Sequence, residues 1–342
     1  MAVHDASGHP QAALRVGVLG ATSLVGSALL PLLCTLGAQI TAFSRRAGSV
    51  RIASNPAHVA VIWRQLAVDG CAETVAEIGT ESGTETGIQG GIQSDVQSGT
   101  DGPGPLQTGL APAAIENWVC LAPIWVLPDC FDLLRAHGAL RVVVLSSTSV
   151  FAKRDSTDPQ EQATAERLAQ AEQRVRDWAR ACSVHWVILR PTLIYGGGQD
   201  KNISEIARFI RRFGFFPVFG SARGQRQPIH AADVAATCVA ALQRREAANR
   251  AYNISGGETL VYTAMVTRVF DALARRPRLL RVPLWSFRLA VAVLRRLPRY
   301  RLWSAAMAER MGRDLVFDHT EAARDLGFKP RRFILAADDL PH

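Results

Sequence analysis

Lysine is scarce in this chain, and its cysteines form no recognisable site. The only lysines are Lys153, Lys201 and Lys329, so the net charge of +9 comes almost entirely from arginine. The six cysteines are scattered, with no C-x-x-C pair and no histidine at metal-ligand spacing. This pattern excludes a disulfide framework and a zinc site of the usual kinds. We therefore predict reduced thiols and no metal.

The sequence also lacks the features of a secretory or membrane-spanning segment. Residues 1–11 include Asp5 and no apolar core, which argues against a signal peptide. The apolar stretch 23–43 is interrupted by Gly37 and is better explained as a buried helix followed by a buried strand. We therefore expect a cytoplasmic protein.

The apolar segments alternate with helical ones. Short apolar runs at 14–19, 39–43, 59–63, 118–124, 141–147 and 184–189 are separated by helical stretches such as 128–137 and 159–181. This order predicts an α/β fold, a doubly wound parallel sheet of the Rossmann type. We expect a dinucleotide-binding core over 12–189 and, intertwined with it, a smaller α/β substrate lobe over 190–335. Residues 79–112, rich in Gly, Ser, Thr and Gln, are expected to be a disordered insertion.

A glycine-containing turn follows the first predicted strand. In GATSLVG (residues 20–26), Gly20 and Gly26 suit a tight turn and close packing of helix on strand, while Ser23 replaces the middle glycine. This context indicates a dinucleotide site at the start of the helix, with Thr22, Ser23 and Leu24 beside the phosphates.

The end of the second predicted strand bears on the choice of cofactor. Ser44, Arg45 and Arg46 occupy the region where an acidic residue would bind the ribose hydroxyls of NAD. Because arginine accommodates the extra phosphate of NADP, we expect NADP to be favoured over NAD. The alternative is that both arginines lie in an ordinary polar turn.

Several motifs, in order along the chain, resemble the extended short-chain dehydrogenase/reductases, the NAD-dependent epimerase/dehydratase family that includes nucleotide-sugar epimerases. They are GATSLVG at 20–26, LAPIW at 121–125, LSSTSVF at 145–151, LRPTLIYG at 189–196, RQPIHAADVA at 226–235, YNISGG at 252–257 and FDHTEAARDLGFKP at 317–330.

The resemblance implies roles for particular residues. Ser147 would hydrogen-bond the reacting carbonyl, Arg226 would hold a sugar diphosphate, and Lys201 and Asn202 would begin a substrate loop. It also implies a cofactor site formed, beyond the residues already named, by Ala122, Pro123, Ser146, Pro191 and Thr192.

The catalytic tyrosine and lysine of this family are missing. No Tyr-x-x-x-Lys exists in the chain, and Thr164 and Leu168 stand at the aligned positions. An atypical oxidoreductase or epimerase acting on a nucleotide-sugar-like or other polar carbonyl substrate could take its proton from Lys153 or Tyr195. Alternatively, the protein is a catalytically silent NAD(P)-binding sensor or assembly factor. A transcriptional co-regulator that reads NADP is a third alternative, and nucleic acid is the least favoured of the possible partners.

Two further features suggest alternatives. Residues 282–303 combine tryptophans and aliphatic residues with five arginines, which is typical of a helix at an anionic membrane surface or of a helix packed on the lobe. A peripheral contact at the inner membrane face and a homodimer are both left open. His230 and Asp233, three residues apart, are an acid/base pair or, as we prefer, a packed histidine and a helix-start carboxylate.

Overall fold

The computed structural model describes residues 14–44, 61–66, 73–74, 114–283 and 310–341. Its centre is an eight-stranded sheet with the strand order β12-β7-β6-β5-β1-β2-β3-β4, in which every neighbouring pair is parallel except β3 and β4. The strands are β1 (Arg15–Leu19), β2 (Gln39–Ser44), β3 (Val61–Leu66), β4 (Glu73–Thr74), β5 (Asn117–Cys120), β6 (Arg141–Leu145), β7 (His185–Pro191) and β12 (Arg250–Ile254). The predicted Rossmann-type α/β fold is confirmed.

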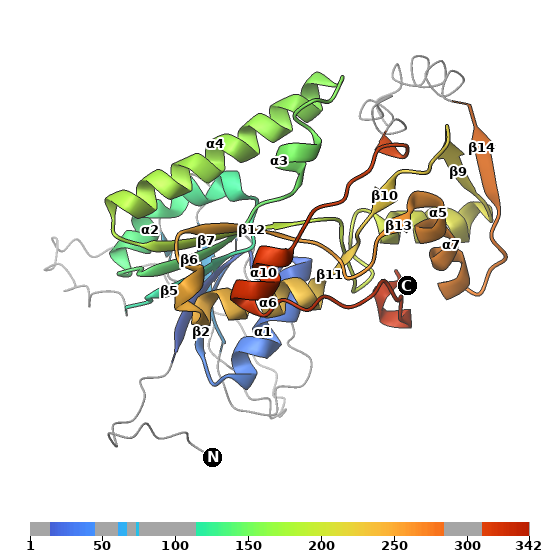
Figure 1. Cartoon of the computed structure of the whole chain (residues 1–342). Coiled ribbons are helices and arrows are strands. Elements are labelled where there is room, and N and C mark those ends of the chain that lie inside the picture. The colour runs from blue at the N-terminus through green and yellow to red at the C-terminus, as the bar shows by residue number, and fades with distance from the viewer. Residues whose placement is uncertain (1–13, 45–60, 67–72, 75–113, 284–309, 342) are drawn as a thin grey trace, which may run out of the picture.

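Helices cover both faces of this sheet (Figure 1). One face carries α1 (Leu24–Thr35), α6 (Ala231–Gln243) and α10 (Thr320–Leu326), and the other carries η1 (Ile124–Cys130), α2 (Phe131–Ala136), α3 (Ser149–Ala152) and α4 (Pro159–Ala181). All five residues of β6 are buried, as expected for a strand covered on both sides.

Local sequence explains where the helices of the core begin. Ser23 caps α1, because its side chain accepts a hydrogen bond from the backbone N–H of Gly26. Asp158 caps α4 in the same way through Gln160, and Pro159 occupies the first turn, where its missing N–H costs nothing. Pro31 lies inside α1, which continues to Thr35.

A smaller group of elements lies beyond the carboxyl ends of the sheet strands (Figure 1). It contains α5 (Ile203–Phe213), α7 (Tyr262–Ala272) and three two-stranded sheets, which pair β8 (Ile194–Tyr195) with β11 (Ile229–His230), β9 (Phe216–Phe219) with β14 (Leu279–Val282), and β10 (Gln225–Arg226) with β13 (Leu260–Val261). These elements have a hydrophobic core of their own. Since β12 lies in the large sheet and α6 packs on that sheet, the chain crosses between the two parts more than once. The division at residue 190 stays a prediction.

Several expectations are affected by which residues are described. The predicted insertion at 79–112 and most of the basic segment 282–303 lie outside them. Among the described residues, no helix combines the length and the apolar character needed to span a bilayer. Cys34, Cys120, Cys182 and Cys238 are free, whereas Cys130 is disulfide-bonded, so the prediction of reduced thiols throughout is wrong at that position.

Candidate functional site

The turn between β1 and α1 has the close packing that its glycines predict. Gly20 adopts a φ of +76°, and a Cβ there would lie 2.6 Å from the backbone nitrogen of Ala122. A Cβ on Gly26 would lie 2.1 Å from the carbonyl oxygen of Ala21. Neither position can hold a larger residue without moving backbone, so both glycines are needed for the close packing of the turn on its neighbouring segments.

A cavity of about 630 Å³ opens beside this turn, at the carboxyl ends of β5, β6 and β7. We call it the sheet-edge cavity. Ligands of doubly wound sheets bind at this edge. Its walls are formed by Ser23, Leu24, Val25, Leu121, Ala122, Pro123, Ile124, Trp125, Leu145, Ser146, Ser147, Ser149, Thr164, Leu168, Pro191, Ile194, Gln199, Asp200 and Lys201.

The cavity brings together eight of the residues singled out from the sequence: Ser23, Leu24, Ala122, Pro123, Ser146, Ser147, Pro191 and Lys201. Others lie around it without forming its walls: Gly20, Thr22, Gly26, Ser44, Thr192 and Asn202. Thr192 donates its hydroxyl to the carbonyl of Gln227 instead. Arg45 and Arg46 lie outside the described residues.

The two positions aligned with the missing tyrosine and lysine also face the cavity. The Thr164 hydroxyl donates to the carbonyl oxygen of Gln160 at 2.8 Å, so its proton is already engaged within α4. Leu168 is buried and apolar. Neither side chain supplies an acid or a cation where the family pattern has one.

The structure moves both predicted proton donors away from the cavity. Tyr195 is fully buried in the lobe core between His230 and Phe333, and its hydroxyl faces the carbonyl of Ile334 at 3.4 Å. Burial, with a smaller effect from Asp339, raises the pKa of Tyr195 to about 12, which makes it a poor acid.

Lys153 ends α3 and is likewise not among the wall residues. Burial and then the charge of Arg310 lower the pKa of Lys153. Neither Lys153 nor Tyr195 forms part of the described wall of the cavity, so this geometry does not favour them as proton donors, and that role stays a prediction.

Arg226 is also placed differently from the expectation of a diphosphate ligand. Its buried guanidinium donates to the backbone carbonyls of Gln225 and Arg313, both at 2.7 Å, and to that of Arg310. The ring of Tyr262 lies 5.4 Å from it. Since these contacts use its donors inside the lobe, Arg226 holds segments of chain together.

His230 and Asp233 do not form an acid/base pair. His230 is the N-cap of α6: its Nδ1 accepts from the backbone of Ala232 at 3.1 Å, which leaves Nε2 to donate to Asp339 at 2.9 Å. Asp233 instead binds Arg331. Asp233 does lie in the first turn of α6, as the sequence predicts, whereas the capping side chain is that of His230.

A buried network that the sequence reading missed lies beneath the cavity. Glu172 of α4 accepts hydrogen bonds from the Ser146 hydroxyl at 2.7 Å, from Arg190 at 2.8 and 2.5 Å, and from Arg176 at 2.9 Å. Burial raises the pKa of Glu172, but the hydrogen bonds and charge of Arg190, together with Ser146, bring the pKa below its usual value. The sequence offered one signal for this network: Arg190, a charged residue at the end of an apolar strand, which requires a carboxylate partner such as Glu172.

Among the wall residues only Asp200 and Lys201 are ionisable. The Asp200 carboxylate is buried and accepts from the backbone of Asn202 at 2.8 Å and from the hydroxyl of Ser204 at 2.6 Å, so it serves to start α5. Lys201 is exposed and is the single cation of the walls within the part of the chain described. That part also contains no group of three or more His, Cys, Asp or Glu residues that could hold a metal ion.

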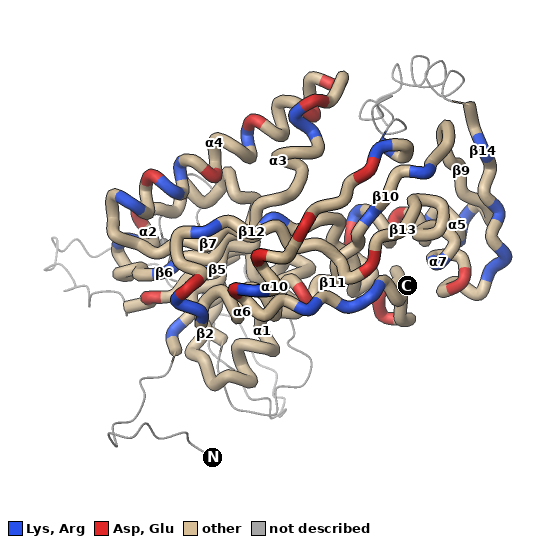
Figure 2. Tube along the Cα trace, in the orientation of Figure 1, with Lys and Arg blue, Asp and Glu red and all other residues tan. Residues whose placement is uncertain are grey.

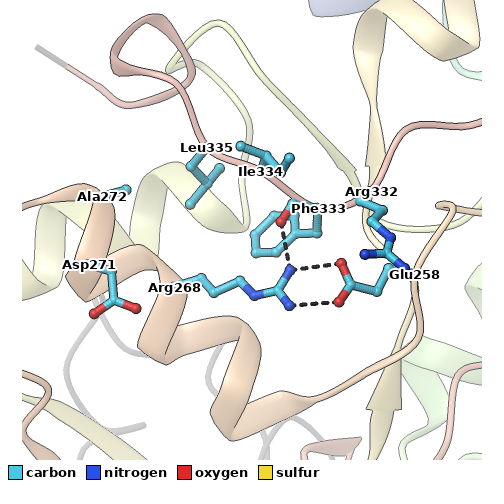
Figure 3. A pocket seen from close by; sticks show the side chains of 8 residues that line it. All are labelled: Glu258, Arg268, Asp271, Ala272, Arg332, Phe333, Ile334 and Leu335. Carbon is cyan, nitrogen blue, oxygen red and sulfur yellow. Dashed lines mark hydrogen bonds and ion pairs between the residues drawn. The ribbon is translucent and has the colours of Figure 1, made fainter.

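Two other features of the described surface are weaker candidates for a functional site. A second hollow of about 390 Å³ on the lobe contains Arg268, which is already paired with Glu258 at 2.6 and 2.8 Å (Figure 3). Basic and acidic residues are interleaved along α4 (Figure 2). The two signs of charge are therefore mixed along this helix, as expected for a solvated face.

Known proteins with similar sequences include members of the family that the motifs resemble. Residues 129–255 match the NAD dependent epimerase/dehydratase family. The chain is 25% identical over 166 residues to a UDP-glucose 4-epimerase of Vibrio cholerae, covering 47% of each protein. It is 27% identical over 97 residues to the mitochondrial NADH dehydrogenase (ubiquinone) 1 alpha subcomplex subunit 9 of Arabidopsis thaliana, covering 28% of this chain and 24% of that one. These matches span about half the length of the curated relatives, or less.

Solved structures agree over nearly the whole chain. The UDP-glucose 4-epimerase of Thermotoga maritima, with UDP-glucose, superposes with a TM-score of 0.58 at 13% identity, covering 92% of this chain and 93% of that one. MoeE5, in complex with UDP-glucose and NAD, superposes with a TM-score of 0.59 at 18% identity, covering 93% and 94%. At these identities the structures support the fold alone. With the sequence match, the resemblance to the epimerase/dehydratase family is confirmed.

Proposed function

From this family resemblance, we propose that the protein is a dinucleotide-dependent oxidoreductase or epimerase that acts on a carbonyl group of a nucleotide-sugar-like or other polar substrate. One observation carries the proposal. The sheet-edge cavity joins the start of α1, at Ser23 and Leu24, to Ser147 at the end of β6. A site for a dinucleotide phosphate and a hydroxyl able to orient a carbonyl thus share one space.

The residues present fit a dinucleotide. The glycines at 20 and 26 keep the turn free of side chains, and free N–H groups at the start of α1 would bind a phosphate of the dinucleotide. Ala122, Pro123 and Pro191 would form the walls along the cofactor. A bound nicotinamide would supply or accept a hydride; Ser147 would donate a hydrogen bond to the reacting oxygen. We assign the proton to Lys201 or to solvent, since Lys201 is the amine that lines the cavity.

The choice between NADP and NAD rests on the end of β2. Ser44 ends this strand and is followed by Arg45 and Arg46, with no carboxylate to bind the ribose hydroxyls. We therefore propose NADP, although the family is described as NAD dependent. Calorimetry should show tighter binding of NADPH than of NADH, with a smaller preference in Arg45→Ala or Arg46→Ala. Equal affinities in the parent protein would contradict the assignment.

A second candidate function is a catalytically silent dinucleotide-binding sensor or assembly factor. Two observations favour it. Thr164 and Leu168 stand in place of the tyrosine and lysine of the family, and the described walls of the cavity contain no tyrosine at all. One of the relatives is a subunit of a respiratory NADH dehydrogenase.

A substrate screen with matched variants separates the two candidates. Epimerisation is measured on UDP-glucose and UDP-galactose in the presence of NADP⁺, NADPH oxidation is measured on UDP-linked ketohexoses, and dinucleotide binding is measured separately. If the protein turns over, Ser147→Ala should lower kcat about 10²-fold, the usual effect of removing one donor to a developing oxyanion. Ser149→Ala, which removes another hydroxyl from the same wall, should change it little. Firm NADPH binding without turnover on any substrate would favour the silent protein.

A further inference from the structure

Two adjacent serines at the end of β6 present opposite hydrogen-bonding roles to the sheet-edge cavity. Ser146 and Ser147 both form its wall. The Ser146 hydroxyl lies 2.7 Å from Oε1 of Glu172. The Ser147 hydroxyl oxygen lies 3.1 Å from the backbone nitrogen of Ser149. Each contact determines whether the hydroxyl can still donate its proton to a ligand.

Ser146 must be the donor in its contact with Glu172. Glu172 is 2% exposed and receives three further hydrogen bonds, two from Arg190 and one from Arg176. A carboxylate so surrounded by guanidinium groups is ionised and can only accept. The Ser146 proton is therefore directed down into the network, and the oxygen lone pairs that remain face the cavity. Ser146 can accept a hydrogen bond from a ligand but has no proton left to donate.

Ser147 has the opposite polarity. Because a backbone N–H can only donate, the Ser147 oxygen is the acceptor from Ser149. No described residue accepts the Ser147 hydroxyl proton in return. This proton is free to turn toward a ligand oxygen in the cavity, which also suits the part assigned to Ser147 in the proposed function.

We propose that Ser146 and Ser147 together recognise a carbonyl group flanked by an N–H or O–H donor, with the carbonyl on Ser147 and the donor on Ser146. The inference rests on the proposed function and makes Ser146 a specificity-determining residue. Two ligands share this chemistry: the carboxamide of a nicotinamide, and a ketone beside a hydroxyl group on a sugar. A ligand with the carbonyl alone would cover the half-buried oxygen of Ser146 without offering it a donor, which lowers affinity.

The first arm of the test concerns the carboxamide. Binding of NADP⁺ is compared by calorimetry with binding of its 3-acetylpyridine analogue, which keeps the carbonyl but replaces the amide N–H₂ by a methyl group. If the pair binds the carboxamide, Ser146→Ala should weaken NADP⁺ about 3- to 10-fold, the range for one neutral hydrogen bond, and leave the analogue almost unchanged. Ser147→Ala should weaken both ligands by a similar factor.

The second arm concerns the substrate. With NADP⁺ saturating, so that no ketone can be reduced, the protein is titrated with a UDP-linked 4-ketohexose and with the same compound lacking its 3-hydroxyl. If the pair binds the hydroxyketone, Ser146→Ala should remove the preference for the 3-hydroxyl, again about 3- to 10-fold.

Two controls keep the outcomes distinct. Ser149→Ala removes a wall hydroxyl but keeps the backbone N–H that Ser147 uses, so it should change neither comparison. Glu172→Gln should reduce the discrimination between the paired ligands as Ser146→Ala does. A glutamine amide can donate to the Ser146 oxygen, so that the Ser146 hydroxyl proton is free to turn toward the cavity. Thermal unfolding verifies that each variant is folded.

A Ser146 effect in the first arm assigns the pair to the cofactor, and one in the second arm assigns it to the substrate. No Ser146 effect in either arm, with normal NADP⁺ binding by the parent protein, overturns the inference and leaves the proposed function standing. Failure of the parent protein to bind any dinucleotide overturns the proposed function, and the inference with it.

Discussion

The two walls of the sheet-edge cavity are built by different kinds of contact. The wall on the sheet side consists of strand ends and the turn into α1, where neighbouring residues fix one another: Ser23 caps its own helix, and Gly20 packs on Ala122 of the adjacent strand end. The wall on the lobe side, residues 194 and 199–201, is held by segments distant in sequence.

The last residues of the chain hold that second wall. We call residues 331–341 the C-terminal strap. Asp339 binds His230, a Cβ on Gly198 would lie 2.6 Å from the Leu340 carbonyl, and Arg211 donates to the Pro341 carbonyl. The sheet side should therefore tolerate changes in the lobe, whereas the position of Lys201 depends on docking of the strap. The following predictions test this difference, from the largest effect to the smallest.

The largest effect is expected beneath the sheet-side wall, at Glu172. In Glu172→Ala the guanidinium of Arg190, whose side chain is 15% exposed, loses its carboxylate partner. Breaking a buried ion pair in this way costs about 3–5 kcal/mol of the free energy of unfolding. This loss of stability is measured by denaturant-induced unfolding. Glu205→Ala removes an exposed partner of Arg208 and should cost about 0.5 kcal/mol or less; equal losses in the two variants would contradict the assignment.

The same carboxylate predicts a dependence on pH. The pKa of Glu172 is lower in the folded protein than its usual value, so the ionised form stabilises the fold. That contribution is fully present above the unfolded pKa of about 4.3 and is lost as the pH falls through the folded value. The stability difference between the parent protein and Glu172→Gln should therefore shrink below about pH 4. A difference that stays constant between pH 7 and pH 3 would contradict it.

In the lobe, the next largest effect is expected at Arg226. Arg226→Ala removes donors from the carbonyls of Gln225, Arg310 and Arg313. A hydrogen bond from a charged group contributes about 1.5–3 kcal/mol, and bonds from one side chain do not add fully, so a loss of about 3 kcal/mol in unfolding free energy is expected. Dinucleotide affinity should change little, because Arg226 does not line the cavity. A large loss of sugar-diphosphate binding with unchanged stability would instead restore the role of diphosphate ligand.

The same contrast explains what sequence could and could not predict. The parallel sheet followed from alternating apolar runs, and the sheet-side wall followed from it, because parallel strands end at a common edge; Ser23, Ala122, Ser147 and Pro191 met there. Arg226 and Tyr195 were placed by motif alone. Their surroundings come from Arg310 and Ile334, which are 84 and 139 residues away, and no local pattern reports such contacts.

A smaller effect is expected from the strap. Asp339→Ala removes hydrogen bonds to His230 and to the backbone of Ala336, which should cost about 1–2 kcal/mol. Because the loop beside it ends in Lys201, a substrate identified by the screen should show a raised KM while NADPH affinity is unchanged. Asp339→Asn keeps one acceptor oxygen, which serves one of the two contacts, and should therefore restore only part of the KM. A loss of NADPH affinity equal to the loss of substrate affinity would show that the two walls are not independent.

The smallest effect is expected at Tyr195, the residue where motif and structure disagree most directly. Tyr195→Phe keeps the ring between His230 and Phe333 and removes only the hydroxyl, whose one hydrogen-bond partner among the described residues is the Ile334 carbonyl at 3.4 Å. Such a long hydrogen bond should contribute about 0.5 kcal/mol or less to stability. Turnover should also be unaffected, because the hydroxyl lies in the lobe core and the pKa of Tyr195 is raised to about 12.

Lys201→Met is the paired variant, since it removes the amine that lines the cavity while leaving the core intact. If Lys201 donates the proton, kcat should fall about 10²-fold or more in that variant alone, the typical contribution of a positioned general acid. A fall of that size in Tyr195→Phe would mean that the lobe rearranges to bring the phenol into the cavity, and that the walls move far more than their contacts imply.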